Sequence, residues 1–110
     1  MKRNEVVIDG RLLQRGALRY TPAGTPAVDF VLEHSSMQME AGGERRAQLR
    51  ITAVALGDTA IEVTTLNANR TVRIAGFLAQ RARNDRELVL HATAAEQAGE
   101  SETIEKARSS

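Results

Sequence analysis

Five segments of the sequence alternate apolar and polar residues with a period of two, the pattern of strands that bury one face. Gly10 and Gly76 fall inside two of them, and a glycine within a strand is typical of the sharp bends of a small closed barrel. This pattern predicts an all-β domain. The segments are Val6–Leu12, Val28–Leu32, Leu49–Ala55, Val72–Leu78 and Leu88–Ala92.

A different spacing lies between the third and fourth segments. Ala60, Val63 and Leu66 would share one face of a helix, and Thr59 and Glu62 have the spacing of a capping box. We therefore predict a short helix over 58–66. The order of three strands, a helix and two strands is that of the OB fold, a five-stranded Greek-key barrel. We favour this barrel over a β-sandwich.

The chain length of 110 residues supports one domain. We place it at residues 1–95, where basic residues outnumber acidic ones. Residues 96–110 lack apolar periodicity and carry more Glu than Lys and Arg, so we expect an acidic, disordered tail.

Several function classes find no support in the sequence. There is no cysteine, and the two histidines, His34 and His91, are better explained as polar packing residues than as a metal pair. Helix capping explains Asp58 and Glu62 better than paired carboxylate catalysis. We find no nucleophile motif and no glycine-rich phosphate loop. We therefore predict a protein that is not an enzyme and uses neither a cofactor nor a metal.

No stretch of the sequence is long enough to cross a membrane as a helix. The longest uninterrupted apolar run is four residues, Ala53–Leu56. The basic start Met1–Arg3 precedes only the short apolar run Val6–Ile8, which Asp9 ends before a secretory segment could form. We expect a cytoplasmic protein.

Arginine dominates the basic residues, with 13 of the 15. Its planar guanidinium is suited to phosphate contacts and to stacking on bases. Single-strand binders of this fold combine a basic groove on the second and third strands with the first and last loops. We predict such a site from the third strand, the first loop and the last loop, made by Arg46, Gln48, Arg50, Arg19, Tyr20, Arg81, Arg83 and Arg86.

Within the last loop, Arg81 and Arg83 would leave the same side of an extended chain and follow consecutive phosphates. We expect less from Arg86, because Asp85 and Glu87 would partly neutralise it.

Aromatic platforms for bases are few. Phe30 alternates onto the core face, and Phe77 lies on the outer face, where we expect it to pack at a dimer interface or cap the barrel rather than stack on a base. The predicted loop 36–44 holds Met37 and Met39, which suit either adaptable protein contacts or loose core packing.

Several stretches resemble the primosomal replication protein N (PriB) family. They are Asn4–Gly10, Thr21–Gly24, Pro26–Ser35 with its Phe-Val-Leu-Glu-His run, Gly76–Leu78 and Leu88–Ala92. The resemblance implies an OB-fold homodimer that binds single-stranded DNA during replication restart, with the helicase PriA and the helicase-loading protein DnaT as partners. Arg81 and Arg83 match basic positions of that family.

Two positions depart from the family pattern. Gln48 stands where some relatives carry tryptophan, and Ser35 stands where they carry a basic residue. Both departures remove a type of DNA contact, so a protein-only adaptor with vestigial DNA binding is the alternative. The PriB-like strands argue against a third reading, an RNA-binding OB module. For the homodimer, we expect pairing through the first strand, whose outer face includes Val7 and Leu13.

Overall fold

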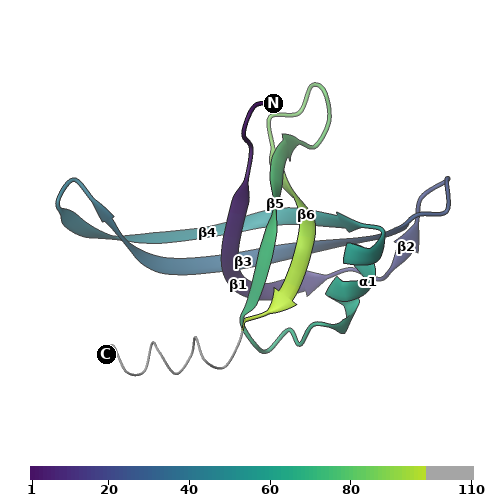
Figure 1. Ribbon diagram of the computed structural model, residues 1–110, viewed down its shortest axis with the longest axis horizontal. Helices are drawn as coiled ribbons and strands as arrows, with labels where there is room; N and C mark the ends of the chain where they lie inside the picture. The colour runs from purple at the N-terminus through teal and green to yellow at the C-terminus, as the bar shows by residue number, and fades with distance from the viewer. Residues whose placement is uncertain (99–110) are drawn as a thin grey trace.

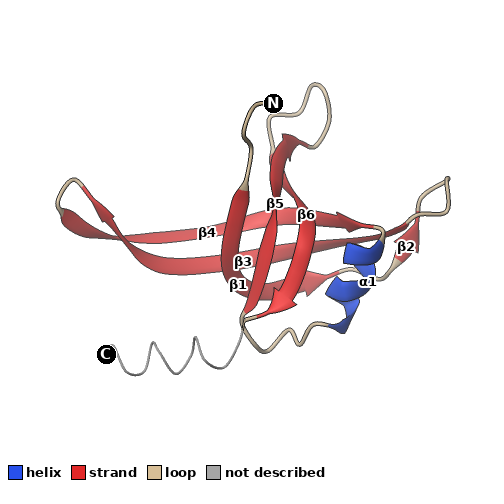
Figure 2. Cartoon of the chain, in the orientation of Figure 1, coloured by secondary structure: helices blue, strands red, loops and turns tan. Residues whose placement is uncertain are grey.

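The computed structural model describes residues 1–98 and confirms the predicted OB-fold barrel. In the described part, six strands and one helix follow each other along the chain (Figures 1 and 2). The helix lies between the strands that correspond to the third and fourth predicted segments. The elements are β1 (Val6–Arg15), β2 (Arg19–Tyr20), β3 (Pro26–Glu40), β4 (Gly43–Leu56), α1 (Asp58–Thr65), β5 (Val72–Gln80) and β6 (Leu88–Gln97).

The barrel closes because β1 pairs with two strands. Its first half, Val6–Gly10, pairs with β5, and its second half, from Arg11 to Arg15, pairs with β3. The strand order is β1-β5-β6-β4-β3-β2. The additional β1–β3 pairing closes five of these strands into the barrel, and β2 extends the sheet beyond β3. All pairs are antiparallel except β4 with β6.

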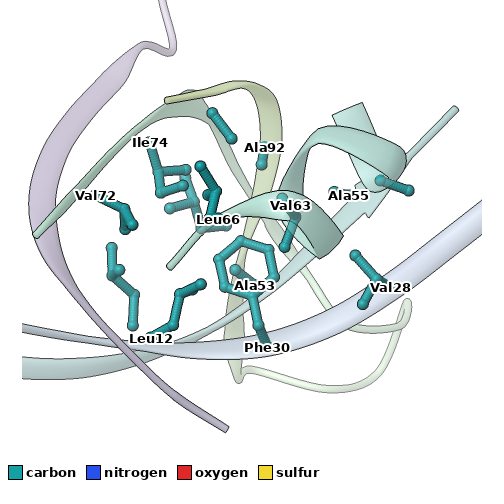
Figure 3. Packing of buried hydrophobic residues seen from close by; sticks show 14 residues of the cluster. Leu12, Val28, Phe30, Ala53, Ala55, Val63, Leu66, Val72, Ile74 and Ala92 are labelled. Atoms are coloured by element: carbon teal, nitrogen blue, oxygen red, sulfur yellow. The ribbon is translucent and has the colours of Figure 1, made fainter. Parts of the chain in front are cut away.

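The core fills the barrel with aliphatic side chains around one aromatic ring, Phe30, which is 2% exposed (Figure 3). This confirms that Phe30 belongs to the inner face. The helix α1 covers one end of the barrel with Ala60 and Val63, and Leu66 just beyond it is also buried. The predicted helical face is therefore correct.

Two strand glycines lie where another strand passes very close. A Cβ on Gly76 would lie 2.0 Å from the carbonyl oxygen of His91, and one on Gly10 would lie 2.3 Å from that of Glu33. The β5–β6 register also shifts between Ala75 and Gly76. Only glycine allows this close approach of another strand.

The predicted capping box is wrong. The helix begins directly after Gly57, which has a positive φ of 67°, and no side chain caps it. The hydroxyl of Thr59 instead donates to the carbonyl of Thr93 on β6, at 3.2 Å. The glycine turns the chain from β4 into α1, so Thr59 lies inside the first turn and is used to attach the helix to the barrel.

The connection expected over 36–44 is a continuous hairpin. β3 and β4 run on to Glu40 and Gly43 around a two-residue turn, in which Ala41 and Gly42 both have positive φ. That conformation matches the twist of a tight hairpin. The hairpin extends beyond the barrel (Figure 1), and Met37 and Met39 are exposed on it. They are therefore not core residues. The first loop also differs, because it contains the short strand β2.

The described chain ends in contact with the barrel. β6 continues to Gln97, two residues beyond the boundary expected at residue 95. The Gln97 amide bonds to the backbone of Asn67 and Thr71. The rest of the expected tail, residues 99–110, lies outside the described residues. Within residues 1–98, no helix is long and apolar enough to span a membrane.

Candidate nucleic-acid interface

The outer face of the β3–β4 hairpin holds three of the predicted site residues. Its register sets Arg46 opposite Met37, Gln48 opposite Ser35 and Arg50 opposite Glu33, and all three β4 side chains are exposed. The sequence prediction that they share one face is correct. Ser35 also accepts a long hydrogen bond from Arg46, at 3.4 Å.

Arg50 belongs to a row of alternating charges that crosses the strands. Its Nε lies 3.1 Å from Glu33 Oε2, and the β1–β3 register sets Arg11 on the other side of Glu33. On the opposite flank, Glu87 lines the same surface depression as Arg50 and forms an ion pair with Arg81. We call these five residues the charge row: Arg81, Glu87, Arg50, Glu33 and Arg11.

Arg19 and Tyr20 lie on the edge strand β2, which pairs with the start of β3. The Arg19 guanidinium holds the Asp29 carboxylate through two contacts of 3.2 Å each. Asp29 is opposite Val54 of β4, so Arg19 lies at the far end of the same outer face. Tyr20 is 64% exposed, which leaves its ring accessible.

The β5–β6 loop differs from the extended chain that we predicted. A turn joins the Asp85 N–H to the Ala82 carbonyl at 3.0 Å, and the strand ends pair through the Arg81 N–H and the Glu87 carbonyl. This pairing brings the side chains of Arg81 and Glu87 together, with Asp85 close by. The hydrogen bond and charge of Glu87 raise the pKa of Arg81 above its ordinary value.

The carboxylates of this loop therefore neutralise Arg81, whereas the sequence predicted that they would neutralise Arg86. Arg83 and Arg86 are exposed, and neither has an acidic partner among residues 1–98.

The two histidines have packing roles. His91 stacks on Phe77, with ring centroids 4.9 Å apart and planes 4° from parallel. His34 bridges the Asp9 carbonyl and the Ser36 hydroxyl, at 2.6 and 2.7 Å. Among the described residues, no group of three or more metal-binding side chains gathers.

The comparisons with known proteins agree with this geometry. Residues 4–94 match a family model described as another single-strand binding protein family. The replication restart protein PriB of Nitrosomonas europaea is 38% identical over 83% of this chain and 84% of its own length. The PriB of Bordetella pertussis is 40% identical over 80% of this chain and 82% of its own. The chain belongs to the PriB family.

Solved structures support the same family and fold. The PriB structure from Ralstonia solanacearum superposes with a TM-score of 0.78 at 31% identity, and covers 89% of this chain and all of that one. The single-stranded DNA binding protein from Thermus aquaticus gives a TM-score of 0.68 at 24% identity over 88% of this chain and half of its own. That second likeness concerns the fold alone.

Sequence reasoning missed two acidic members of this PriB-family interface, Asp29 and Glu33, and it assigned Glu87 to Arg86 rather than to Arg81. The signal for Glu33 was present, because a two-residue turn at Ala41–Gly42 sets the hairpin register and with it the Glu33–Arg50 pair. The Glu87–Arg81 pair could not be predicted from the sequence, because it depends on the conformation of the β5–β6 loop.

Proposed function

We propose that this chain binds single-stranded DNA as an accessory protein of replication restart. The observation that carries the proposal is the convergence on one outer face of Arg46, Gln48 and Arg50 with the flanking β2 and the β5–β6 loop. This is the surface on which OB folds bind nucleic-acid strands. Membership of a family of replication restart proteins supports the biological setting.

The mechanism is recruitment, with no catalytic step by this chain. A cytoplasmic homodimer would hold exposed DNA and the helicase PriA together, raise their effective concentration and then pass the DNA to DnaT. The first half of β1 supports dimer formation: Val6–Gly10 pairs with β5 along one edge and has no strand on the other edge within residues 1–98. Val7 on this segment is 69% exposed. A monomer mass by light scattering at micromolar concentration would contradict the dimer.

A fluorescence-anisotropy titration of labelled oligo-dT at two salt concentrations tests the DNA site. Each phosphate contact with a single strand contributes about 0.7 to the log–log salt slope. We expect Arg46→Ala/Arg50→Ala and Arg81→Ala/Arg83→Ala each to weaken binding and to lower this slope by about 0.7 to 1.4. In the second variant most of the loss should come from Arg83, because Glu87 and Asp85 hold Arg81.

The proposal is contradicted if both double variants fold and bind oligo-dT with the affinity and salt slope of the parent. That outcome would remove this face from the DNA site.

A protein-only adaptor is the second candidate, and the ion pairs of the interface favour it. Arg19, Arg50 and Arg81 each hold a carboxylate, so a phosphate must compete for them. A surface of alternating charge suits a mixed-charge protein surface better than a polyanion. Gln48 also offers no ring on which a base can stack. Retained PriA binding in a parent that binds no oligo-dT would decide for this candidate.

A further inference from the structure

The N-terminal segment lies alongside the end of β5, next to the β5–β6 loop (Figure 1). The Asn4 amide makes two bonds to the backbone of Leu78: its Nδ2 donates to the carbonyl at 2.8 Å, and its Oδ1 accepts from the N–H at 3.0 Å. These bonds continue the β1–β5 register, in which Val6 pairs with Gly76. Lys2 and Arg3 precede Asn4, and the N-terminal end of the chain lies beside the β5–β6 loop (Figure 1).

This placement concentrates positive charge at the end of the barrel that carries the β5–β6 loop. The N-terminal segment and the loop together carry five basic residues and three acidic ones, Glu5, Asp85 and Glu87. Arg81 forms ion pairs with two of these acids, Asp85 and Glu87. The other four basic side chains are exposed and have no acidic partner in the described part of the chain: Lys2, Arg3, Arg83 and Arg86. We call these four the basic end.

An aromatic surface lies next to the basic end. Phe77 is 39% exposed on the outer face of β5, and its ring is stacked on that of His91 from β6. Phe77 directly precedes Leu78, whose backbone bonds to the Asn4 side chain, so this aromatic surface lies next to the N-terminal segment. Parallel rings of this kind present a flat π surface to a further ring.

From this juxtaposition we infer that the DNA site continues past the β5–β6 loop. There, Lys2 and Arg3 would join Arg83 and Arg86 in binding phosphates, and the Phe77–His91 pair would stack on a base. Binders of single strands combine these two features. The inference rests on the DNA-binding function proposed above and extends the DNA path beyond β3 and β4. It assigns Phe77 the role that the sequence disfavoured.

The charge pattern identifies the occupant as a polyanion. The charge row alternates in sign, whereas the basic end is of one sign and its nearby carboxylates are engaged with Arg81. Glu5 is the exception, since it lies in the same N-terminal segment as Lys2 and Arg3. A phosphate backbone fits this arrangement, with the bases turned toward the rings.

The test compares four variants of the full chain in the oligo-dT titration at two salt concentrations. Lys2→Ala/Arg3→Ala should lower the salt slope by about 1.4, because two phosphate contacts are lost at about 0.7 each. Phe77→Leu should weaken binding by roughly tenfold with the salt slope unchanged, since base stacking is lost but no charge is. Phe77→Tyr keeps a ring and should bind like the parent.

Arg70→Ala is the matched charge control. Arg70 is exposed in the connection between α1 and β5, at the opposite end of the barrel, and its removal should leave the slope unchanged. If Phe77→Leu fails to fold, the Lys2→Ala/Arg3→Ala result decides, because those side chains are exposed outside the core.

The outcomes separate the two proposals. If Lys2→Ala/Arg3→Ala and folded Phe77→Leu bind like the parent while Arg46→Ala/Arg50→Ala is impaired, this extension of the DNA site is wrong and the proposed function stands. If the basic end contacts only proteins, these variants would also bind DNA like the parent, and the DNA contact proposed here would be wrong. A parent that binds no oligo-dT overturns both.

Discussion

Glu33 limits how strongly the outer face of the hairpin can bind DNA, and Glu33→Gln tests this directly. Its carboxylate lies 3.1 Å from the Arg50 guanidinium, and the β1–β3 register sets Arg11 beside it. A phosphate that approaches Arg50 must displace this partner and also meets the negative charge of Glu33. The glutamine variant keeps the shape and polarity of the side chain and removes only the charge.

The expected size of the effect follows from the exposure of the pair. The side chains are 69% and 36% exposed, so the ion pair contributes at most about 1 kcal/mol. Its removal should strengthen oligo-dT binding by up to roughly fivefold. If Arg50 then makes a full phosphate contact, the log–log salt slope should steepen by about 0.7.

The assay is the anisotropy titration of oligo-dT at two salt concentrations, with Glu40→Gln as the matched control. Glu40 also pairs with an arginine, Arg45, at 3.4 Å, but near the turn of the hairpin and on its other face. The control should change neither affinity nor slope. A folded Glu33→Gln variant with the parent's affinity and slope, or equal changes in both carboxylate variants, would show that Glu33 does not limit DNA binding.

Three further predictions concern stability. Gly76→Ala should destabilise the fold by about 3 kcal/mol, because the added Cβ would lie 2.0 Å from the His91 carbonyl oxygen. The melting temperature should therefore fall by more than about 10 °C. Arg15→Met should lower the free energy of unfolding by about 1–2 kcal/mol in a denaturant titration, since the Arg15 guanidinium donates to two carbonyls at the end of α1, at 3.0 and 2.7 Å. Deletion of residues 99–110 should leave the melting temperature unchanged and slightly tighten DNA binding, because it removes net negative charge. Deletion of residues 97–110 should lower the melting temperature, because the hydrogen bonds of Gln97 are lost. Equal melting temperatures for the two truncations would contradict the last of these.

The sequence by itself determined the five barrel strands, the helix and the face that each of them buries. The strands were predictable because a period of two is a local pattern, and Phe30 and the face of Ala60 and Val63 follow from alternation and helical spacing. The order of these elements was enough for the OB barrel, and the PriB-like stretches were enough for the family. The outer face of Arg46, Gln48 and Arg50 also followed from alternation along one strand.

Tertiary structure decided which charges remain available on that surface. The charge row joins residues from β1, β3, β4 and the β5–β6 loop. Arg81 rather than Arg86 is neutralised because the ends of this loop pair with each other. Likewise, the Asn4 side chain holds the N-terminal segment against β5 by bonding to the backbone of Leu78, far along the chain. Such contacts depend on the register between strands that are distant in sequence. Barrel closure sets that register, and no local pattern encodes it.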